Sequence, residues 1–258
     1  MTALRLFCLI LIILPHQYVW GQDQRLTDSL RKAVNSDSSV NAMLKLGREY
    51  ITLPDTAQKY LDAALSRALR TGDSLEIAFS HLYLGMLAER NGDFEKANDL
   101  LSLSQSLSQK RSSPLLLSEQ ASEKAILLMR SGNLPEAIST LDNALNQPFA
   151  AAVDERISLL LAGSMISFQQ GDLAKSLRYG HEAESILSAS VAHRTQAQIF
   201  NNIGTVYMHL GQPDLSACYL ENALEIRRKS GDSKGEATCL NNLSILHNRT
   251  GNTLKAIE

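Results

Sequence analysis

Two pairs of adjacent asparagines give the sequence its clearest capacity for recognition chemistry. Asn201 and Asn202 are followed, 40 residues later, by Asn241 and Asn242. An asparagine amide carries both a hydrogen-bond donor and an acceptor, so it can hold the backbone of an extended peptide whatever that peptide's side chains are. The same amides can instead bond one another or an adjacent helix as interhelical struts. Both interpretations are open, and the spacing indicates that the two pairs occupy equivalent positions in a repeating structure.

The residue types that usually carry catalysis or bind metals form no recognisable constellation. The six histidines show no ligand spacing, and His181 with Glu184 lacks the second histidine, four residues along one helix, that a zinc motif needs. No glycine-rich loop precedes a Lys-Ser/Thr pair, and no serine sits on a strand-to-helix elbow. We therefore predict a protein that is not an enzyme, with no catalytic residues, no metal site and no cofactor.

Composition and charge narrow the class of partner. The formal net charge is −2, and 44% of the residues are apolar, so the chain can bury a core but offers no basic surface for nucleic acid. We therefore predict no nucleic-acid partner. Cys218 and Cys239 are the only cysteines after residue 21. An oxidising compartment would permit one disulfide between them, but they fall on different faces of neighbouring predicted helices, and free thiols are expected.

The elements that position the asparagines are helices in a repeat. The recurring turns are Gly92-Asp93, Gly132-Asn133, Gly171-Asp172, Gly211-Gln212 and Gly251-Asn252, at spacings of 40, 39, 40 and 40 residues. Phe200, Ile203, Gly204 and Tyr207 lie at i, i+3, i+4 and i+7, which predicts one face of a helix. Glycine is a poor helix former, so its place here predicts close approach of a neighbouring helix. The other copies also carry small residues at this position: Gly47, Gly85, Ala125, Ser164 and Ser244.

These segments resemble the tetratricopeptide repeat. Leu46-Gly47-x-x-Tyr50 and Ile203-Gly204-x-x-Tyr207 are similar to its first-helix signature. The second-helix signature is resembled by Ala97-x-x-x-Leu101, Ala137-x-x-x-Leu141 and Ser216-x-x-x-Leu220. The period of about 40 departs from the usual 34. The resemblance implies an all-α, right-handed superhelical solenoid of helix pairs over residues 41–258, with about five pairs and the last one incomplete.

The resemblance also implies a protein or peptide segment bound in a concave groove lined by first helices. Asn202 and Asn242 are the first candidates for holding a peptide backbone, and Asn201 and Asn241 the next. The candidates beside them are Thr205, Met208 and Arg249. Counting one step off the core stripe predicts that the rest of the groove is lined by Phe79, Leu82, Tyr83, Met86, Arg90, Glu123, Ile126, Arg130, Met165, Phe168, Gln169, His209 and Ile245.

The two ends of the chain carry their own signals. Arg5 precedes an apolar run at 6–14 that Pro15 closes, which predicts a signal peptide over residues 1–21, too short to span a membrane. We expect cleavage near Gly21, export to the periplasm or another extracytoplasmic space, and a capping helix and turn over 22–40. The last helix begins only shortly before Glu258, so we expect a longer protein, with room for a membrane helix after residue 258 and no membrane insertion within the mature residues present.

The leading functional interpretation is a non-enzymatic module that binds protein or peptide segments outside the cytoplasm. Bacterial signalling proteins that resemble this chain place such repeats between a signal peptide and a membrane helix, ahead of a histidine kinase or a DNA-binding regulator. That similarity implies a sensory or scaffold region. Two alternatives remain open: a free-standing secreted or periplasmic adaptor, and the non-catalytic part of a longer enzyme such as a histidine kinase.

Overall fold

The computed structural model describes residues 29, 32, 39–109, 111–188 and 191–251. The predicted signal peptide at 1–21 and nearly all of the predicted capping segment at 22–40 lie outside the described residues. The residues after Gly251, where the second helix of the last repeat was predicted, also lie outside them.

Eleven α-helices and one short 3-10 helix make up the described part of the chain, which contains no strand. In chain order these are α2 (Val40–Glu49), α3 (Pro54–Thr71), α4 (Ser74–Arg90), α5 (Phe94–Ser108), α6 (Pro114–Arg130), α7 (Leu134–Leu145), η1 (Pro148–Ala151), α8 (Val153–Gln170), α9 (Leu173–Ser185), α10 (His193–His209), α11 (Pro213–Ser230) and α12 (Ser233–Arg249). None of the described helices is long and apolar enough to cross a membrane.

The helices pack as consecutive antiparallel pairs in a right-handed solenoid, as the sequence predicted. α2 pairs with α3, and the same arrangement repeats through α10 and α11. The described residues therefore hold five complete pairs followed by α12, the first helix of a further one. The repeat spacing predicted about five pairs with the last incomplete, and the described helices include one more pair position than that.

The turn inside each pair follows from two adjacent residues. Gly92 and Gly171 both have φ of +82°, the left-handed conformation that ends a helix without a Cβ penalty. The following aspartates start the second helices, because Asp93 accepts a hydrogen bond from the Lys96 N–H and Asp172 accepts one from the Lys175 N–H. Such side-chain caps satisfy amides that the first turn of a helix leaves unpaired. Each Gly-Asp dipeptide therefore marks the turn within one helix pair, and the spacing between these dipeptides is the length of one repeat.

Small residues bring the two helices of a pair close together. A Cβ built on Gly204 of α10 would lie 2.9 Å from Leu220 Cγ of α11, closer than two carbon atoms normally approach. The Ser216 hydroxyl donates to the Gly204 carbonyl at 2.8 Å. The preceding pair repeats this contact, where Ser176 donates to the Ser164 carbonyl at 2.8 Å. The close approach that the sequence predicted at these positions is confirmed.

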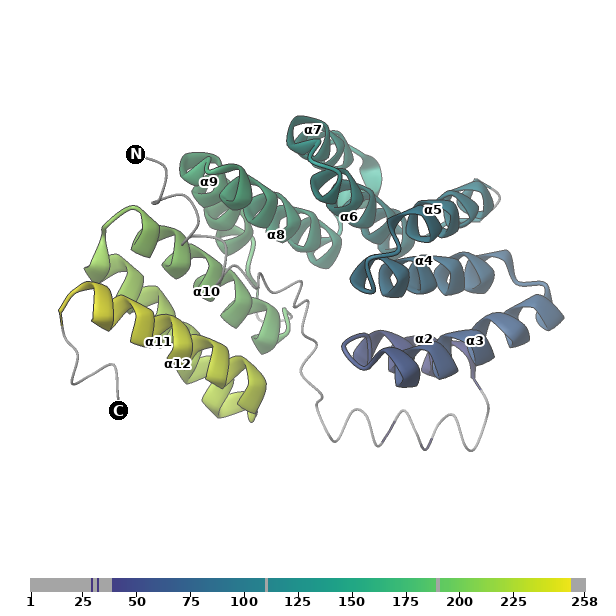
Figure 1. Cartoon of the computed structure of the whole chain (residues 1–258), viewed down its shortest axis with the longest axis horizontal. Coiled ribbons are helices and arrows are strands. Elements are labelled where there is room, and N and C mark those ends of the chain that lie inside the picture. Colours follow the sequence, from purple (N-terminus) through teal and green to yellow (C-terminus); the bar gives the residue numbers. More distant parts are fainter. Residues whose placement is uncertain (1–28, 30–31, 33–38, 110, 189–190, 252–258) are drawn as a thin grey trace.

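First and second helices occupy different sides of the array. Each first helix packs against the first helix of the next pair, so α2, α4, α6, α8, α10 and α12 form a continuous row. The second helices make no comparable contact with one another in the described part of the chain. The pairs therefore approach each other more closely on the first-helix side, and they follow an arc (Figure 1). We call the exposed side of the first-helix row the inner face.

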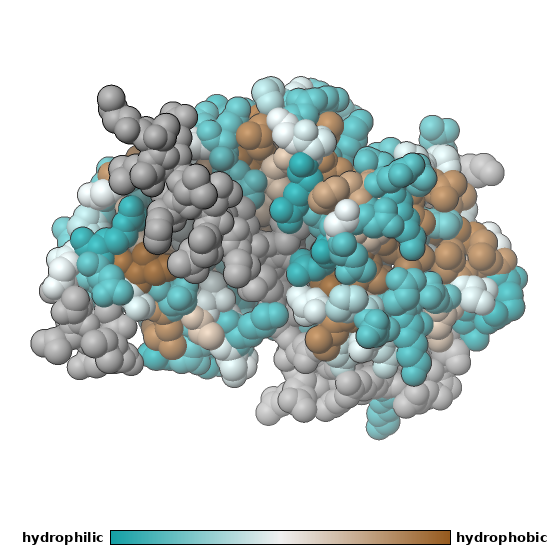
Figure 2. All heavy atoms as spheres, in the orientation of Figure 1, coloured by the Kyte–Doolittle hydropathy of each residue, from teal (hydrophilic) through white to brown (hydrophobic). Residues whose placement is uncertain are grey.

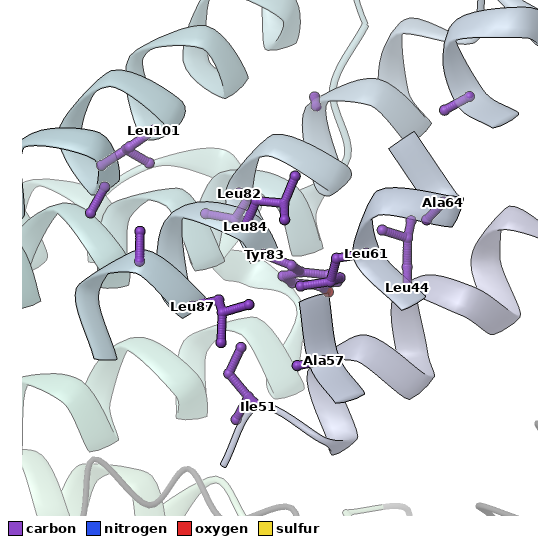
Figure 3. Packing of buried hydrophobic residues seen from close by; sticks show 14 of the residues in the cluster. Leu44, Ile51, Ala57, Leu61, Ala64, Leu82, Tyr83, Leu84, Leu87 and Leu101 are labelled. Carbon is purple, nitrogen blue, oxygen red and sulfur yellow. The ribbon is translucent and has the colours of Figure 1, made fainter. Parts of the chain in front are cut away.

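The apolar core runs between the helix layers in three clusters rather than one. The first cluster joins α2 to α6, and Figure 3 shows Leu61 of α3 and Leu87 of α4 pointing into the space between its helices. The second cluster runs from α6 to α10, and the third joins α10, α11 and α12. On the surface, apolar residues form patches among polar ones, as Figure 2 shows for one face.

Candidate functional site

The repeat brings the four predicted asparagines onto neighbouring first helices. Asn201 and Asn202 lie on α10, and Asn241 and Asn242 lie on α12. The Asn242 Nδ2 donates to Asn201 Oδ1 at 2.9 Å and joins the two helices. Asn201, Asn202 and Asn242 are half-buried, whereas Asn241 is exposed. The strut interpretation therefore applies to Asn201 and Asn242, and peptide binding by the asparagines stays a prediction.

Each asparagine pair contributes one strut and one unoccupied amide. Asn201 and Asn242 bond one another across the two helices. The side chains of Asn202 and Asn241 make no hydrogen bond within the described part of the chain. An amide with a free donor and a free acceptor can bond both the carbonyl and the N–H of a peptide backbone. Of the four amides, those of Asn202 and Asn241 are thus free of internal hydrogen bonds among the described residues, whereas the sequence put Asn202 and Asn242 first as candidates.

The three remaining candidates have different surroundings. The Thr205 hydroxyl donates to the Asn201 carbonyl at 2.8 Å, so its proton is used within its own helix. Met208 is only 7% exposed and belongs to the third core cluster, so it packs between helices rather than presenting a surface. Arg249 is exposed at the end of α12. Of these three, Arg249 alone offers an open charged group.

Two aromatic rings lie on α10 and α8, the two first helices that precede α12 and its Arg249. His209 of α10 meets Phe168 of α8 edge-on, with ring centroids 4.8 Å apart. Partial burial lowers the pKa of His209, and the positive charge of Arg249 lowers it further. His209 is therefore a neutral imidazole at neutral pH. The carboxyl-terminal half of the inner face thus combines an amide pair, a neutral imidazole and one guanidinium.

The amino-terminal half of the inner face differs from its prediction. Leu82, Tyr83, Glu123 and Ile126 were expected to line an open groove, but they are 0%, 5%, 2% and 3% exposed. The expectation was wrong because a first helix such as α4 contacts α2, α3, α5 and α6. Its buried arc is therefore wider than the stripe of a helix covered on one side only. Partial exposure remains at the predicted positions Phe79, Met86, Met165, Phe168 and Gln169.

In place of an open groove, charged side chains link α2, α4 and α6, which are the first helices of the first three pairs. Arg48 of α2 forms an ion pair with Glu119 of α6, and its guanidinium lies 5.5 Å above the ring of Tyr83 of α4. Arg130 of α6 pairs with Glu89 of α4 at 2.8 Å. These links between helices were not predicted from the sequence. The polar run from Ser118 to Glu123, where other copies carry more apolar residues, is the signal that could have revealed them.

A second polar cluster lies between α9, α10 and α11. His181 contacts Glu184 through Nδ1 at 2.9 Å and the Tyr207 hydroxyl through Nε2 at 3.0 Å. The rings of Tyr207 and Tyr219 are stacked, with centroids 5.7 Å apart. Within the described residues no group of three or more histidine, cysteine or acidic side chains is placed to bind a metal ion. The bonds from His181 to Tyr207 and from the Tyr219 hydroxyl to Glu184 tie α9 to both helices of the next pair.

The two cysteines of the described chain are free thiols. Cys218 is exposed on α11, whereas Cys239 is buried in α12. Burial raises the pKa of the Cys239 thiol to about 11, so it stays protonated and behaves as a small apolar core residue.

Residues 195–258, which contain all four asparagines, match a family model described as tetratricopeptide repeat. No curated protein matches the chain. Among solved structures, BtubC (BKLC) from P. vanneervenii is similar to this chain with 21% identity and a TM-score of 0.61, covering 85% of this chain and 87% of BtubC. The APC/C hetero-tetramer Cut9-Hcn1 is similar with 14% identity and a TM-score of 0.60, covering 90% of this chain and 41% of the other. At these identities the likeness shows the fold, a solenoid of helix pairs.

Proposed function

We propose that the chain is a non-enzymatic scaffold that binds an extended protein or peptide segment along its inner face. The observation that carries this proposal is the pair of unoccupied amides at Asn202 and Asn241, held on adjacent first helices by the Asn201–Asn242 hydrogen bond. A strut of this kind fixes the distance between two recognition groups before any ligand arrives. Preorganised groups lose less conformational entropy on binding.

The neighbouring groups suggest the chemistry of the segment. Asn202 and Asn241 suit its backbone, so they favour no particular side chain. Phe168, edge-on to His209, offers an aromatic surface, and exposed Arg249 offers a positive charge. The occupant we propose is an extended segment that carries an acidic group near Arg249 and an apolar side chain near Phe168.

We further propose that the scaffold works outside the cytoplasm, as the sensory or scaffold region of a bacterial signalling protein. The support is the apolar run at 6–14 behind Arg5, which has the length of a signal-peptide core. A free-standing periplasmic or secreted adaptor, or the non-catalytic part of a longer enzyme, is the alternative. The gene downstream of codon 258 separates them: a membrane helix followed by a kinase or DNA-binding domain supports the first, and a stop codon supports the adaptor.

Binding is tested with a displayed library of random dodecapeptides selected on the immobilised chain. The affinity of enriched peptides is then measured for the parent and for the double variant Asn202→Ala/Asn241→Ala. Two lost hydrogen bonds of about 1 kcal/mol each correspond to a rise in Kd of roughly twentyfold to thirtyfold. The matched control is Asn98→Ala/Asn222→Ala, which removes exposed asparagines from the second helices α5 and α11.

The control variant should bind the selected peptides as the parent does. Equal affinity of the parent and the inner-face variant would contradict the proposed site. Loss of affinity in the control instead would place recognition on the second helices.

A further inference from the structure

Buried polar side chains are concentrated where the second helix pair meets the third. Of the ten buried residues of α6, five are polar: Ser118, Glu119, Gln120, Ser122 and Glu123. No other described helix buries as many polar side chains. We define the polar seam as Glu89 of α4, Ser104 of α5 and Glu119, Gln120 and Glu123 of α6. All five residues are at most 6% exposed.

The polar seam interrupts the apolar core of the solenoid. The first and second core clusters meet at α6 without merging. Between consecutive complete pairs, the junction of α5 with α6 is the least extensive in the described chain. The Gln120 amide donates to the Ser104 hydroxyl at 2.7 Å, and Ser104 donates to the Ala78 carbonyl at 2.8 Å. Figure 1 shows α6 and α7 between the α4–α5 and α8–α9 pairs that they join.

The position of Glu123 makes this junction dependent on a proton. Its side chain is 2% exposed, and Oε1 has no hydrogen-bond partner among the described residues. The charged groups around it are Glu89 and Arg90 on α4 and Glu119 and Arg130 on α6. Glu119 is itself paired with Arg48 of α2 and feels the charge of Glu155 on α8. Arg130 is engaged by Glu89 and Arg48 by Glu119. A charge on Glu123 would therefore be a third buried carboxylate, with Arg90 the remaining guanidinium of the group.

We propose that the polar seam is a proton-controlled joint, at which loss of the Glu123 proton loosens α6 from α4 and lets the third helix pair move against the second. A buried carboxyl without a full set of hydrogen bonds is tolerated only in its neutral form. The ionised form must either draw in water or separate from Glu89 and Glu119. The α5–α6 junction is the least extensive between complete pairs in the described chain, so the separation disrupts the least packing there.

The pH range over which the joint opens follows from the direction in which the pKa of Glu123 is shifted. Burial, reinforced by the charge of Glu89, raises the pKa of Glu123 to about 8 against the opposing effect of Arg130 and Arg90. An exposed glutamate titrates near 4.3. The stabilising contribution is therefore complete below about pH 4 and is lost progressively as the pH rises through about 8. The seam is closed in mildly acidic conditions and opens in mildly alkaline ones.

Hydrogen exchange of the full chain tests the joint without any ligand. The parent and Glu123→Gln are compared at several pH values between about 6 and 8. The protection of each amide is the intrinsic exchange rate at that pH divided by the observed exchange rate. If opening ionises Glu123, the protection of α6 amides in the parent falls by up to about tenfold per pH unit. In Glu123→Gln, which keeps the shape of the neutral acid, the protection should not change with pH.

Two controls make the result specific. Glu95→Gln removes an exposed carboxylate from α5, and it should retain the pH dependence of the parent. Amides of α10 and α11, which lie beyond the seam, should keep constant protection in all variants. Equal pH dependence in the parent and Glu123→Gln, or an equal loss of protection in α6 and α11, overturns the proposal.

A distance measurement provides a second readout of the same motion. Asp99, Ser139 and Cys218 are exposed, repeat-equivalent positions on α5, α7 and α11. Spin labels on Asp99→Cys and Ser139→Cys, in a Cys218→Ser/Cys239→Ala background, span the seam. Labels on Ser139→Cys and native Cys218, with Cys239→Ala, do not. Alkaline pH should broaden the first distance distribution and not the second, and Glu123→Gln should abolish the broadening. A first distribution that stays unchanged, or one that broadens equally in Glu123→Gln, contradicts the joint.

Discussion

Asn242 of α12 donates a hydrogen bond of 2.9 Å to Asn201 of α10, across the junction of two consecutive repeats. The bond joins first helices rather than the two helices of one pair, so it fixes the spacing of the inner face directly. The adjacent residues Asn202 and Asn241 keep side-chain amides that make no hydrogen bond among the described residues. One amide pair therefore stabilises the array, and the other is open to a ligand.

The two roles predict opposite effects on stability. Asn201→Ala and Asn242→Ala should each lower the free energy of unfolding by about 1 kcal/mol, and the double variant should cost little more, because a single bond is lost. Asn202→Ala should stay within about 0.5 kcal/mol of the parent. Urea unfolding of the four proteins checks this. Additive losses at Asn201 and Asn242 would show that the bond contributes nothing.

Overpacking the contact between α10 and α11 should destabilise the chain. Gly204→Leu places a side chain where a Cβ alone would lie 2.9 Å from Leu220 Cγ. The expected loss is roughly 1–3 kcal/mol, read from a circular dichroism melt. Glu221→Leu, at an exposed position of α11, introduces the same side chain without the contact and serves as the control. A Gly204→Leu melt that matches the parent would contradict the packing role.

The junction of α11 with α12 should weaken in acid. Buried Asp232 is paired with Arg227 and accepts a hydrogen bond from the Gly235 N–H. Burial alone would raise the pKa of Asp232, but the Gly235 bond and the Arg227 charge hold it below its usual value. Its stabilising contribution is therefore present above about pH 3.9 and is lost as the pH falls through the depressed pKa.

Asp232→Asn tests this junction. At pH near 7 the variant should be less stable by roughly 1.5–3 kcal/mol, the range for hydrogen bonds to charged groups. The difference from the parent should shrink in strong acid, where the parent also loses the charge. Urea unfolding at both pH values measures it, with Glu221→Gln on the exposed face of α11 as control. If the difference in unfolding free energy between the parent and Asp232→Asn stays constant with pH, the carboxylate charge is not involved.

Export should remove the amino-terminal segment. Expression of the full reading frame in a bacterial host, followed by sequencing of the product from the extracytoplasmic fraction, should give an amino terminus at or within about two residues of Gln22. Recovery of a product that retains Met1 in the cytoplasm would contradict the proposed localisation.

The fold could be predicted because its determinants are local. Gly92 and Asp93 end one helix and start the next within two residues, and their recurrence at a fixed spacing repeats the unit. The small residue at Gly204 and its counterparts needed only the partner helix of the same pair. These features depend on neighbours that are near in sequence, so the sequence pattern contains them.

The inner face was predicted less well because it depends on contacts between repeats. The bond from Asn242 to Asn201 spans 41 residues, and the offset of one pair against the next decides which asparagine of each pair takes part. Glu123 was expected on an open surface, but packing of α4 against α6 buries it. The position of a residue in the helical period gives the direction of its side chain. It does not say how many neighbouring helices pack against that side of the helix.

Photo-crosslinking tests the central claim, that the first helices bind an extended segment, most directly. A photoreactive residue replaces Asn202 on α10 in one protein and Asn222 on α11 in another, and each is irradiated with the same library-selected peptide. We predict a covalent adduct from position 202 and none from position 222, because α10 belongs to the first-helix row and α11 does not. An adduct formed at position 222 and absent at position 202 would contradict it.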